Sequence, residues 1–139
     1  MIKSKGQKVI GVIPAHLNSI RFPNKILFPL YNLPMIEHVR RRAMLCKNFS
    51  NVIVATCDHE ISDQIIKFGG DVIMTSKSHS NGTTRVAEAI EKIDCSHVVI
   101  IQGDEPLLLP QYLDLMIDSI IQKPKIDAWN VTGPIIKNK

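Results

Sequence analysis

Short apolar runs alternate with amphipathic stretches along most of this 139-residue chain. A brief apolar run between turn signals favours a buried strand, and apolar residues repeated at helical spacing favour an α-helix. Strands that alternate with helices imply right-handed crossovers and a parallel sheet with helices on both faces. We therefore predict one domain, residues 1–139, with an α/β fold of the Rossmann-like kind. The predicted strands cover about residues 8–14, 52–55, 71–74, 97–101 and 127–132, and the predicted helices cover about 34–47, 59–68, 84–93 and a segment that begins at Pro110.

The composition is that of a globular protein that handles a small ligand. Apolar residues make up 45% of the chain and charged residues 22%, which argues against disorder. The formal charge of +4 suits a small phosphorylated ligand better than long nucleic acid, and 5% aromatic residues leave little material for base stacking. No apolar run approaches the ~18 residues of a membrane span. We predict neither nucleic acid nor a membrane as a partner.

The cysteines and the first residues bear on the compartment. Cys46, Cys57 and Cys95 are odd in number and widely spaced, so neither a disulfide framework nor a zinc site is predicted. Reduced thiols fit a cytosolic protein. The basic start resembles a signal peptide, but its apolar run ends at Pro14 and no small-residue cleavage site follows. We expect a cytoplasmic protein.

Three loops that follow predicted strands carry residues suited to binding an anion. The first holds Arg21 and Lys25, the second leads into Gly82-Thr83-Thr84-Arg85 at a predicted helix start, and the third holds Asp104 and Glu105. In an open parallel sheet, ligands bind beyond the carboxyl ends of the strands. The three loops are therefore expected to converge on one site.

Polyphosphate chemistry needs this combination of groups. Cations and helix N-termini neutralise phosphates, and a carboxylate holds magnesium between phosphate oxygens. The chain lacks both G-x-G-x-x-G and G-x-x-x-x-G-K-[ST], so side chains and loop amides would bind the phosphates. Each signal also has a purely structural interpretation. Arg21 and Lys25 are then ordinary surface residues, Asp104-Glu105-Pro106 is a plain turn, and Thr83 or Thr84 is a helix cap.

Two further expectations concern charged residues outside these loops. Arg40-Arg41-Arg42 is predicted to form a solvated helix face, with a phosphate or partner patch as the alternative. Asp58 precedes the helix predicted for about residues 59–68, where its carboxylate could cap the first turn.

A series of short motifs runs through nearly the whole chain: Val12-Ile13-Pro14-Ala15, Arg21-Phe22-Pro23-Asn24-Lys25, Pro34-Met35-Ile36-Glu37-His38-Val39, His79-Ser80-Asn81-Gly82-Thr83-Thr84-Arg85 and Gln102-Gly103-Asp104-Glu105-Pro106-Leu107. In order and approximate spacing, they resemble the sugar-acid cytidylyltransferases, and most closely those that act on 3-deoxy-manno-octulosonate (Kdo). The run that begins at Gln102 is the most specific of them. The resemblance implies a Rossmann-like nucleotide-diphospho-sugar transferase fold.

The resemblance also implies an activity. A member of this family transfers CMP from CTP to Kdo or a related acidic sugar and releases pyrophosphate, in the synthesis of lipopolysaccharide or another surface polysaccharide. The sugar hydroxyl attacks the α-phosphorus in line, and positioning with charge stabilisation supplies the catalysis. The implied partners are CTP and an acidic sugar, and the implied cofactor is Mg²⁺.

Site residues follow from the same motifs, position by position. Arg21 and Lys25 match phosphate-contacting positions, and Asp104 matches the magnesium ligand. These three are the predicted catalytic residues. The predicted contacts to nucleotide or substrate are Pro14, Ala15, His16, Ser19, Gly82, Thr83, Arg85 and Gln102.

The chain departs from the family in two ways. His16 stands where the family usually has an arginine that contacts phosphate, so CTP affinity is expected to be weaker and more dependent on pH. The chain is also expected to represent only the N-terminal part of the family. It would then lack a second metal-binding aspartate, much of the sugar pocket and most of the dimer surface, although a homodimer stays open. The alternatives are a CTP-binding remnant without turnover and a sister cytidylyltransferase for another sugar acid.

Overall fold

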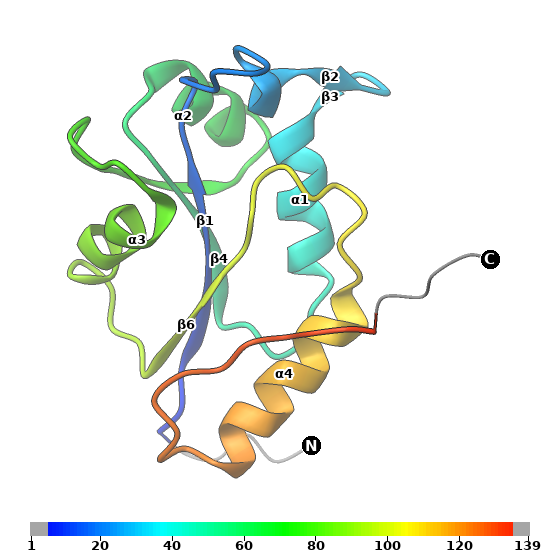
Figure 1. The fold of residues 1–139 in the computed structure, drawn as a ribbon, viewed down its shortest axis with the longest axis vertical. Coiled ribbons are helices and arrows are strands. Elements are labelled where there is room, and N and C mark those ends of the chain that lie inside the picture. Colours follow the sequence, from blue (N-terminus) through cyan, green and yellow to red (C-terminus); the bar gives the residue numbers. More distant parts are fainter. Residues whose placement is uncertain (1–5, 135–139) are drawn as a thin grey trace.

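The computed structural model describes residues 6–134, which form a parallel sheet with helices on both faces (Figure 1). The order of the strands across the sheet is β5-β4-β1-β6, and every pairing in it is parallel. The predicted α/β fold is therefore confirmed, and so are the first four predicted strands. The strands are β1 (Val9–Ala15), β4 (Asn51–Thr56), β5 (Asp71–Met74) and β6 (His97–Ile100), and the helices are α1 (Met35–Met44), α2 (His59–Lys67), α3 (Gly82–Ile90) and α4 (Pro110–Gln122).

Alternation along the strands divides the core into two layers. Successive side chains of a strand point to opposite faces of the sheet. On one face Val9 and Ile13 of β1 pack with buried residues of α1, α2 and α4. On the other face Ile10 and Val12 pack with α3. Both faces of β1 are covered, which explains why its apolar run is continuous.

The start of α1 is joined to the core by buried charges, which corrects the prediction for the triple arginine. Glu37 is fully buried, and its carboxylate accepts hydrogen bonds from Arg40 at 2.7 and 2.8 Å and from Arg41 at 2.8 Å. Arg40 is also buried and donates to the carbonyl of Phe68 at 3.2 Å, just beyond α2. Of the three arginines only Arg41 is exposed, so the run is not a solvated face. Glu37, the partner of Arg40 and Arg41, lies one helical turn earlier in α1. Its burial depends on how the folded elements pack and is not visible in the sequence.

A two-stranded hairpin, which the sequence did not predict, follows the first loop. β2 (Pro29–Leu30) and β3 (Leu33–Pro34) pair antiparallel and are preceded by a short 3₁₀-helix, η1 (Lys25–Leu27). The turn residues Tyr31 and Asn32 have φ angles of 48° and 68°. Positive φ at both central residues is what a type I′ hairpin turn requires, but Tyr31 is not a residue type that signals it.

The prediction of a fifth strand at residues 127–132 is wrong. This segment has no regular secondary structure. It lies beside β6 and α4 and does not pair with β6 as a strand. Trp129 packs against the core, while Asp127, Ala128 and Asn130 are exposed. The side-chain oxygen of Asn130 accepts a hydrogen bond from the Val131 amide at 2.9 Å, and such a local bond competes with pairing in a sheet.

Two further findings concern the described residues 6–134. The three cysteines are free thiols, of which Cys46 is buried. None of the helices in this part of the chain is both long enough and apolar enough to span a membrane.

Candidate functional site

The loops that follow β1 and β6 and the start of α3 meet at the carboxyl end of the sheet, as the parallel topology predicts. A Cβ added to Gly82, the first residue of α3, would lie 3.0 Å from Cγ of Pro14 in β1. A Cβ added to Gly103 would lie 3.0 Å from Cδ1 of Ile26 and 3.4 Å from Cγ2 of Ile13. These close approaches leave little room for any side chain larger than glycine and fix the spacing of the three segments.

An ion pair joins the first loop to the third. Nζ of Lys25 lies 2.7 Å from Oδ2 of Asp104, although 79 residues separate them in sequence. Both side chains are partly exposed, at 39% and 45%. An exposed pair of this kind contributes between about 0 and 1 kcal/mol, so a ligand that offers each group a better partner can separate them.

The remaining residues of the first loop lie at the surface. Arg21 is exposed and, within the described part of the chain, has neither a hydrogen bond nor an ion pair from its side chain. His16 is exposed immediately after β1, and Ser19 is half-buried. Pro14 and Ala15 are buried in β1, so only their backbone or the edge of the ring can face a ligand. Arg21 is therefore a cation available to an anion.

The start of α3 presents backbone amides to the same region. Asn81, not a threonine, caps the helix: its side-chain oxygen accepts a hydrogen bond from the Thr84 amide at 2.9 Å. The predicted threonine cap is therefore wrong, and the helix begins two residues earlier than predicted. The first amides of a helix have no partner within it, and together with the helix dipole they favour an anion. Gly82 and Thr83 hold these positions.

Arg85 points into the protein. It is 3% exposed, and its Nη1 donates to Oγ1 of Thr75 at 2.6 Å and to the carbonyl of Ser76 at 3.2 Å. The side chain thereby fixes the beginning of the loop between β5 and α3. Contact between Arg85 and a ligand stays a prediction, and the geometry gives the residue a structural task in this loop.

Glu88, which sequence reasoning missed, holds the same loop from the next turn of α3. Its carboxylate accepts the Ser76 amide at 2.9 Å and lies in hydrogen-bond contact with Nε2 of His79. The His79 contact is the main cause that lowers the pKa of Glu88, and the Ser76 amide adds to it. Glu88 and His79 stand nine residues apart, and their sequence carries no signal that they meet.

Asp58 supports the first loop. It occupies the cap position of α2 as predicted, but its carboxylate makes no capping bond there. Oδ2 instead accepts the amide of Leu17 at 2.8 Å. The carboxylate thus links the end of β4 to the loop that carries Arg21 and Lys25. The contact forms because β1, which leads into this loop, lies next to β4 in the sheet.

The third loop adds two more polar residues. Gln102 and Asp104 are exposed on either side of the buried Gly103. Among the described residues there is no group of three or more histidine, cysteine or acidic side chains that could hold a metal ion alone. A cation at Asp104 would therefore complete its shell with ligand oxygens and water, which is how Mg²⁺ is commonly bound beside phosphates.

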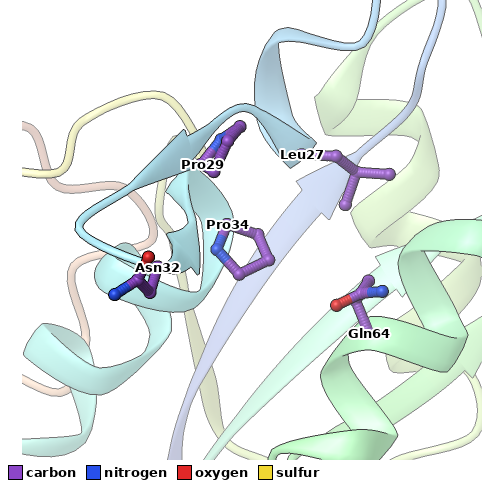
Figure 2. A pocket seen from close by; sticks show the side chains of 5 residues that line it. All are labelled: Leu27, Pro29, Asn32, Pro34 and Gln64. Atoms are coloured by element: carbon purple, nitrogen blue, oxygen red, sulfur yellow. The ribbon is translucent and has the colours of Figure 1, made fainter.

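A groove of about 760 Å³ beside β6 takes in Gln102 and Glu105 of the third loop. A second pocket of about 260 Å³ lies between the β2–β3 hairpin and α2 and is lined by Leu27, Pro29, Asn32, Pro34 and Gln64 (Figure 2). None of the predicted site residues lines it. The candidate site is an open surface at the strand ends, and we place the chemistry there because charged groups, helix amides and the ends of two strands meet at that point.

A parallel α/β sheet whose carboxyl-end loops carry exposed cations, a carboxylate and the start of a helix is typical of nucleotide-binding proteins. The chain belongs to the cytidylyltransferase family, whose sequence profile matches residues 10–135. The predicted family is thus confirmed.

Individual relatives agree with this assignment. A 3-deoxy-manno-octulosonate cytidylyltransferase from Zea mays is 43% identical over 119 residues, which is 84% of this chain and 40% of the relative. An 8-amino-3,8-dideoxy-manno-octulosonate cytidylyltransferase from a Shewanella species is 42% identical over 134 residues, which is 94% of this chain and 55% of the relative. The chain therefore spans about half the length of the curated relatives it matches.

Solved structures share the fold. A CMP:2-keto-3-deoxy-manno-octonic acid synthetase in complex with CTP superposes on this chain with a TM-score of 0.83 at 35% identity. The superposition covers 85% of this chain and 49% of the synthetase chain. A Mycobacterium tuberculosis protein solved with manganese superposes with a TM-score of 0.63 at 21% identity. This superposition covers 84% of this chain and 61% of the Mycobacterium chain. These likenesses confirm the predicted nucleotidyltransferase fold.

Proposed function

We propose that this chain provides the nucleotide-binding part of a cytidylyltransferase that transfers CMP from CTP to an eight-carbon sugar acid and releases pyrophosphate. The observation that carries the proposal is the Lys25–Asp104 ion pair at 2.7 Å. It brings together a cation from the loop that also carries the exposed Arg21 and a carboxylate from the loop after β6. The start of α3, with its first backbone amides, packs against Pro14 at the end of β1. The family membership and the CTP complex of a relative support cytidine as the nucleoside.

Each group has a task in this reaction. Arg21 and Lys25 neutralise the phosphates and the charge that builds up on the leaving pyrophosphate. The amides of Gly82 and Thr83 bind further oxygens of the nucleotide. Binding the triphosphate would separate Lys25 from Asp104, at the small cost of an exposed ion pair. The ion pair thus keeps both side chains in place before the ligand arrives.

Asp104 is the proposed ligand for a divalent cation, and we propose Mg²⁺. An exposed carboxylate next to a phosphate site fits this hard, oxygen-seeking ion. A bound Mg²⁺ neutralises phosphate charge and orients the oxygens around the reacting phosphorus. We propose that Gln102, which is exposed on the same loop, contacts the sugar or the nucleotide.

We propose that two contacts, one part-buried and one buried, position these groups without touching the substrate. Asp58 anchors the first loop through the Leu17 amide, and Arg85 anchors the loop before α3 through Thr75. Positioning of this kind is the main source of rate in a reaction that needs no protein nucleophile. His16 and Ser19 lie on the anchored first loop, where we propose that they contact the nucleotide.

The sugar is proposed from the names of the relatives. The Zea mays relative is named for 3-deoxy-manno-octulosonate and the Shewanella relative for its 8-amino, 8-deoxy analogue. The two sugars differ at one carbon. A second candidate function, CTP binding without turnover, is favoured by one observation: the chain spans only about half the length of these relatives.

The nucleotide site is tested by calorimetric titration of the chain with CTP, with and without Mg²⁺. We expect Asp104→Asn to abolish the gain in affinity that Mg²⁺ provides. Glu105→Gln, which removes the neighbouring exposed carboxylate, is the matched control and should keep that gain. Equal Mg²⁺ dependence in the parent and in Asp104→Asn would refute the assignment of Asp104.

Turnover is tested separately by pyrophosphate release from CTP, with each of the two sugars as acceptor. Release with one sugar identifies it as the substrate. CTP binding without pyrophosphate release in the presence of either sugar would reject the enzyme proposal for this chain and support the binding-only alternative.

A further inference from the structure

Arg42 has a different partner from the other two arginines of its run. Arg40 and Arg41 donate to the buried carboxylate of Glu37. Nη1 of Arg42 instead donates to the main-chain carbonyl of Leu108 at 3.1 Å. The residue is half-buried, and within the described part of the chain its guanidinium takes part in no ion pair. A cation in the last turn of α1 also favours the helix dipole, but Arg41 lies in the same turn, so the dipole does not explain the bond to Leu108.

The carbonyl that Arg42 binds lies at the end of the loop that carries Asp104. Figure 1 shows this loop, between β6 and α4, passing across α1. Two consecutive turns form it: the Glu105 amide donates to the Gln102 carbonyl at 3.4 Å, and the Leu108 amide donates to the Glu105 carbonyl at 3.1 Å. Asp104 lies inside the first turn, and Leu108 closes the second. Because the turns share Glu105, a shift of the Leu108 carbonyl would be passed on to Asp104.

The element that carries Lys25 also rests on α1. η1 lies against α1, and the Met35 amide at the start of α1 donates to the Phe28 carbonyl just after η1 at 2.9 Å. The same helix therefore supports both members of the ion pair. It supports Lys25 through η1 at its start, and it supports the loop of Asp104 through Arg42 near its end.

We propose that Arg42 is a positioning residue for the nucleotide site: through the Leu108 carbonyl it holds the loop of Asp104 in place for the divalent cation and the triphosphate. Arg42 acts through the backbone of the loop and does not touch the substrate. Asp58 and Arg85 hold the other two loops, so each loop of the site then has an anchor in a neighbouring element. The effect of Arg42 on nucleotide binding rests on the proposed function, whereas its hold on the loop does not.

The hold on the loop is tested in the free chain by hydrogen exchange, measured by NMR. Arg42→Gln shortens the side chain and removes the guanidinium, while the side chain of Leu108 stays packed against the core. We therefore expect exchange at the Glu105 and Leu108 amides to become about 5-fold faster, with the urea midpoint close to that of the parent. Arg41→Gln is the matched control, because it removes the same charge from the neighbouring exposed residue and should leave both exchange rates unchanged. Arg42→Lys keeps a cationic donor and should restore most of the protection.

The effect on the site is measured in the same variants by calorimetric titration with CTP, with and without Mg²⁺. Arg42→Gln should reduce the gain in affinity that Mg²⁺ provides by about 5-fold, because Asp104 is then held less firmly. Arg41→Gln should keep the gain, and Arg42→Lys should recover most of it.

Four results would overturn the role of Arg42: unchanged exchange in Arg42→Gln, an unchanged gain from Mg²⁺, an equal effect of Arg41→Gln, or a loss of the gain that only follows a fall in the urea midpoint. A parent chain that binds no CTP would overturn the proposed function together with the effect of Arg42 on nucleotide binding. The exchange rates would then still decide whether Arg42 holds the loop.

Discussion

The buried carboxylate of Glu37 offers a sharp test of what stabilises the fold. Glu37 is fully buried and makes two hydrogen bonds with Arg40, which is itself nearly buried and extends to the Phe68 carbonyl. The hydrogen bonding that Arg40 donates to Glu37 is the main cause that raises the pKa of Arg40. Replacing Glu37 by Gln keeps the shape and one acceptor but leaves the guanidinium of Arg40 buried without a counter-charge.

Removal of one partner from a buried ion pair costs about 3–5 kcal/mol. Because glutamine retains one oxygen that can accept from Arg40, we expect Glu37→Gln to cost about 3 kcal/mol, the lower end of that range. With a urea dependence of about 2 kcal/mol per molar, the unfolding midpoint would fall by about 1.5 M. The measurement is urea unfolding followed by circular dichroism.

Arg41→Gln is the matched control for Glu37→Gln. Arg41 bonds to the same carboxylate at 2.8 Å, but its side chain is 51% exposed. An exposed pair at this helical spacing contributes about 0.5 kcal/mol or less. We therefore expect a cost several times smaller than that of Glu37→Gln. A loss below about 1 kcal/mol for Glu37→Gln would refute the argument that the buried charge pair holds α1 to the core.

Three further predictions follow from the pKa values and the packing. The hydrogen bond from His79 lowers the pKa of Glu88 below its ordinary value of 4.5, so the ionised carboxylate stabilises the fold at pH values above 4.5. This contribution is lost as the pH falls through the lowered pKa. The stability difference between the parent and Glu88→Gln, measured by urea unfolding, should therefore shrink between about pH 6 and pH 3; a constant difference would contradict this. Burial raises the pKa of the Cys46 thiol to about 12, so iodoacetamide should label it at about pH 8 only after unfolding, as peptide mass spectrometry would show. A Cβ on Gly70 would lie 2.6 Å from Cγ2 of Ile65 and 2.9 Å from Cδ and Nε of Arg40, so Gly70→Ala should cost about 1–3 kcal/mol in urea unfolding, and an unchanged midpoint would show that both side chains can move.

Much of the fold could be predicted from local patterns. The first four strands are short, largely apolar runs, and each lies close to where its run predicts. The run of β1 is continuous because that strand is covered on both faces. The predicted convergence of three loops also follows from topology alone. Parallel strands end at the same edge of the sheet, so Lys25 and Asp104 could be expected to lie close together before their ion pair was seen.

Other parts of the candidate site depend on partners that are distant in sequence. Asp58 looks like an ordinary helix cap, yet its carboxylate holds the Leu17 amide of a neighbouring loop. Arg85 looks like a ligand-binding residue within a family motif, yet its side chain is buried against Thr75 and Ser76. A sequence pattern shows which groups are polar, but the direction of a side chain is set by the hydrogen-bond partners that packing brings near it.

The sequence by itself determined the α/β architecture, the family and the end of the sheet where the candidate site is proposed, because hydrophobic periodicity and short motifs are local properties of the chain. Only the tertiary structure decided that Arg40 is buried, that residues 127–132 do not extend the sheet, and that no strand within residues 6–134 pairs with the outer edge of β6. Those outcomes depend on whether a buried charge finds a counter-charge and whether a strand edge finds a partner. Both are settled by contacts between segments far apart in sequence.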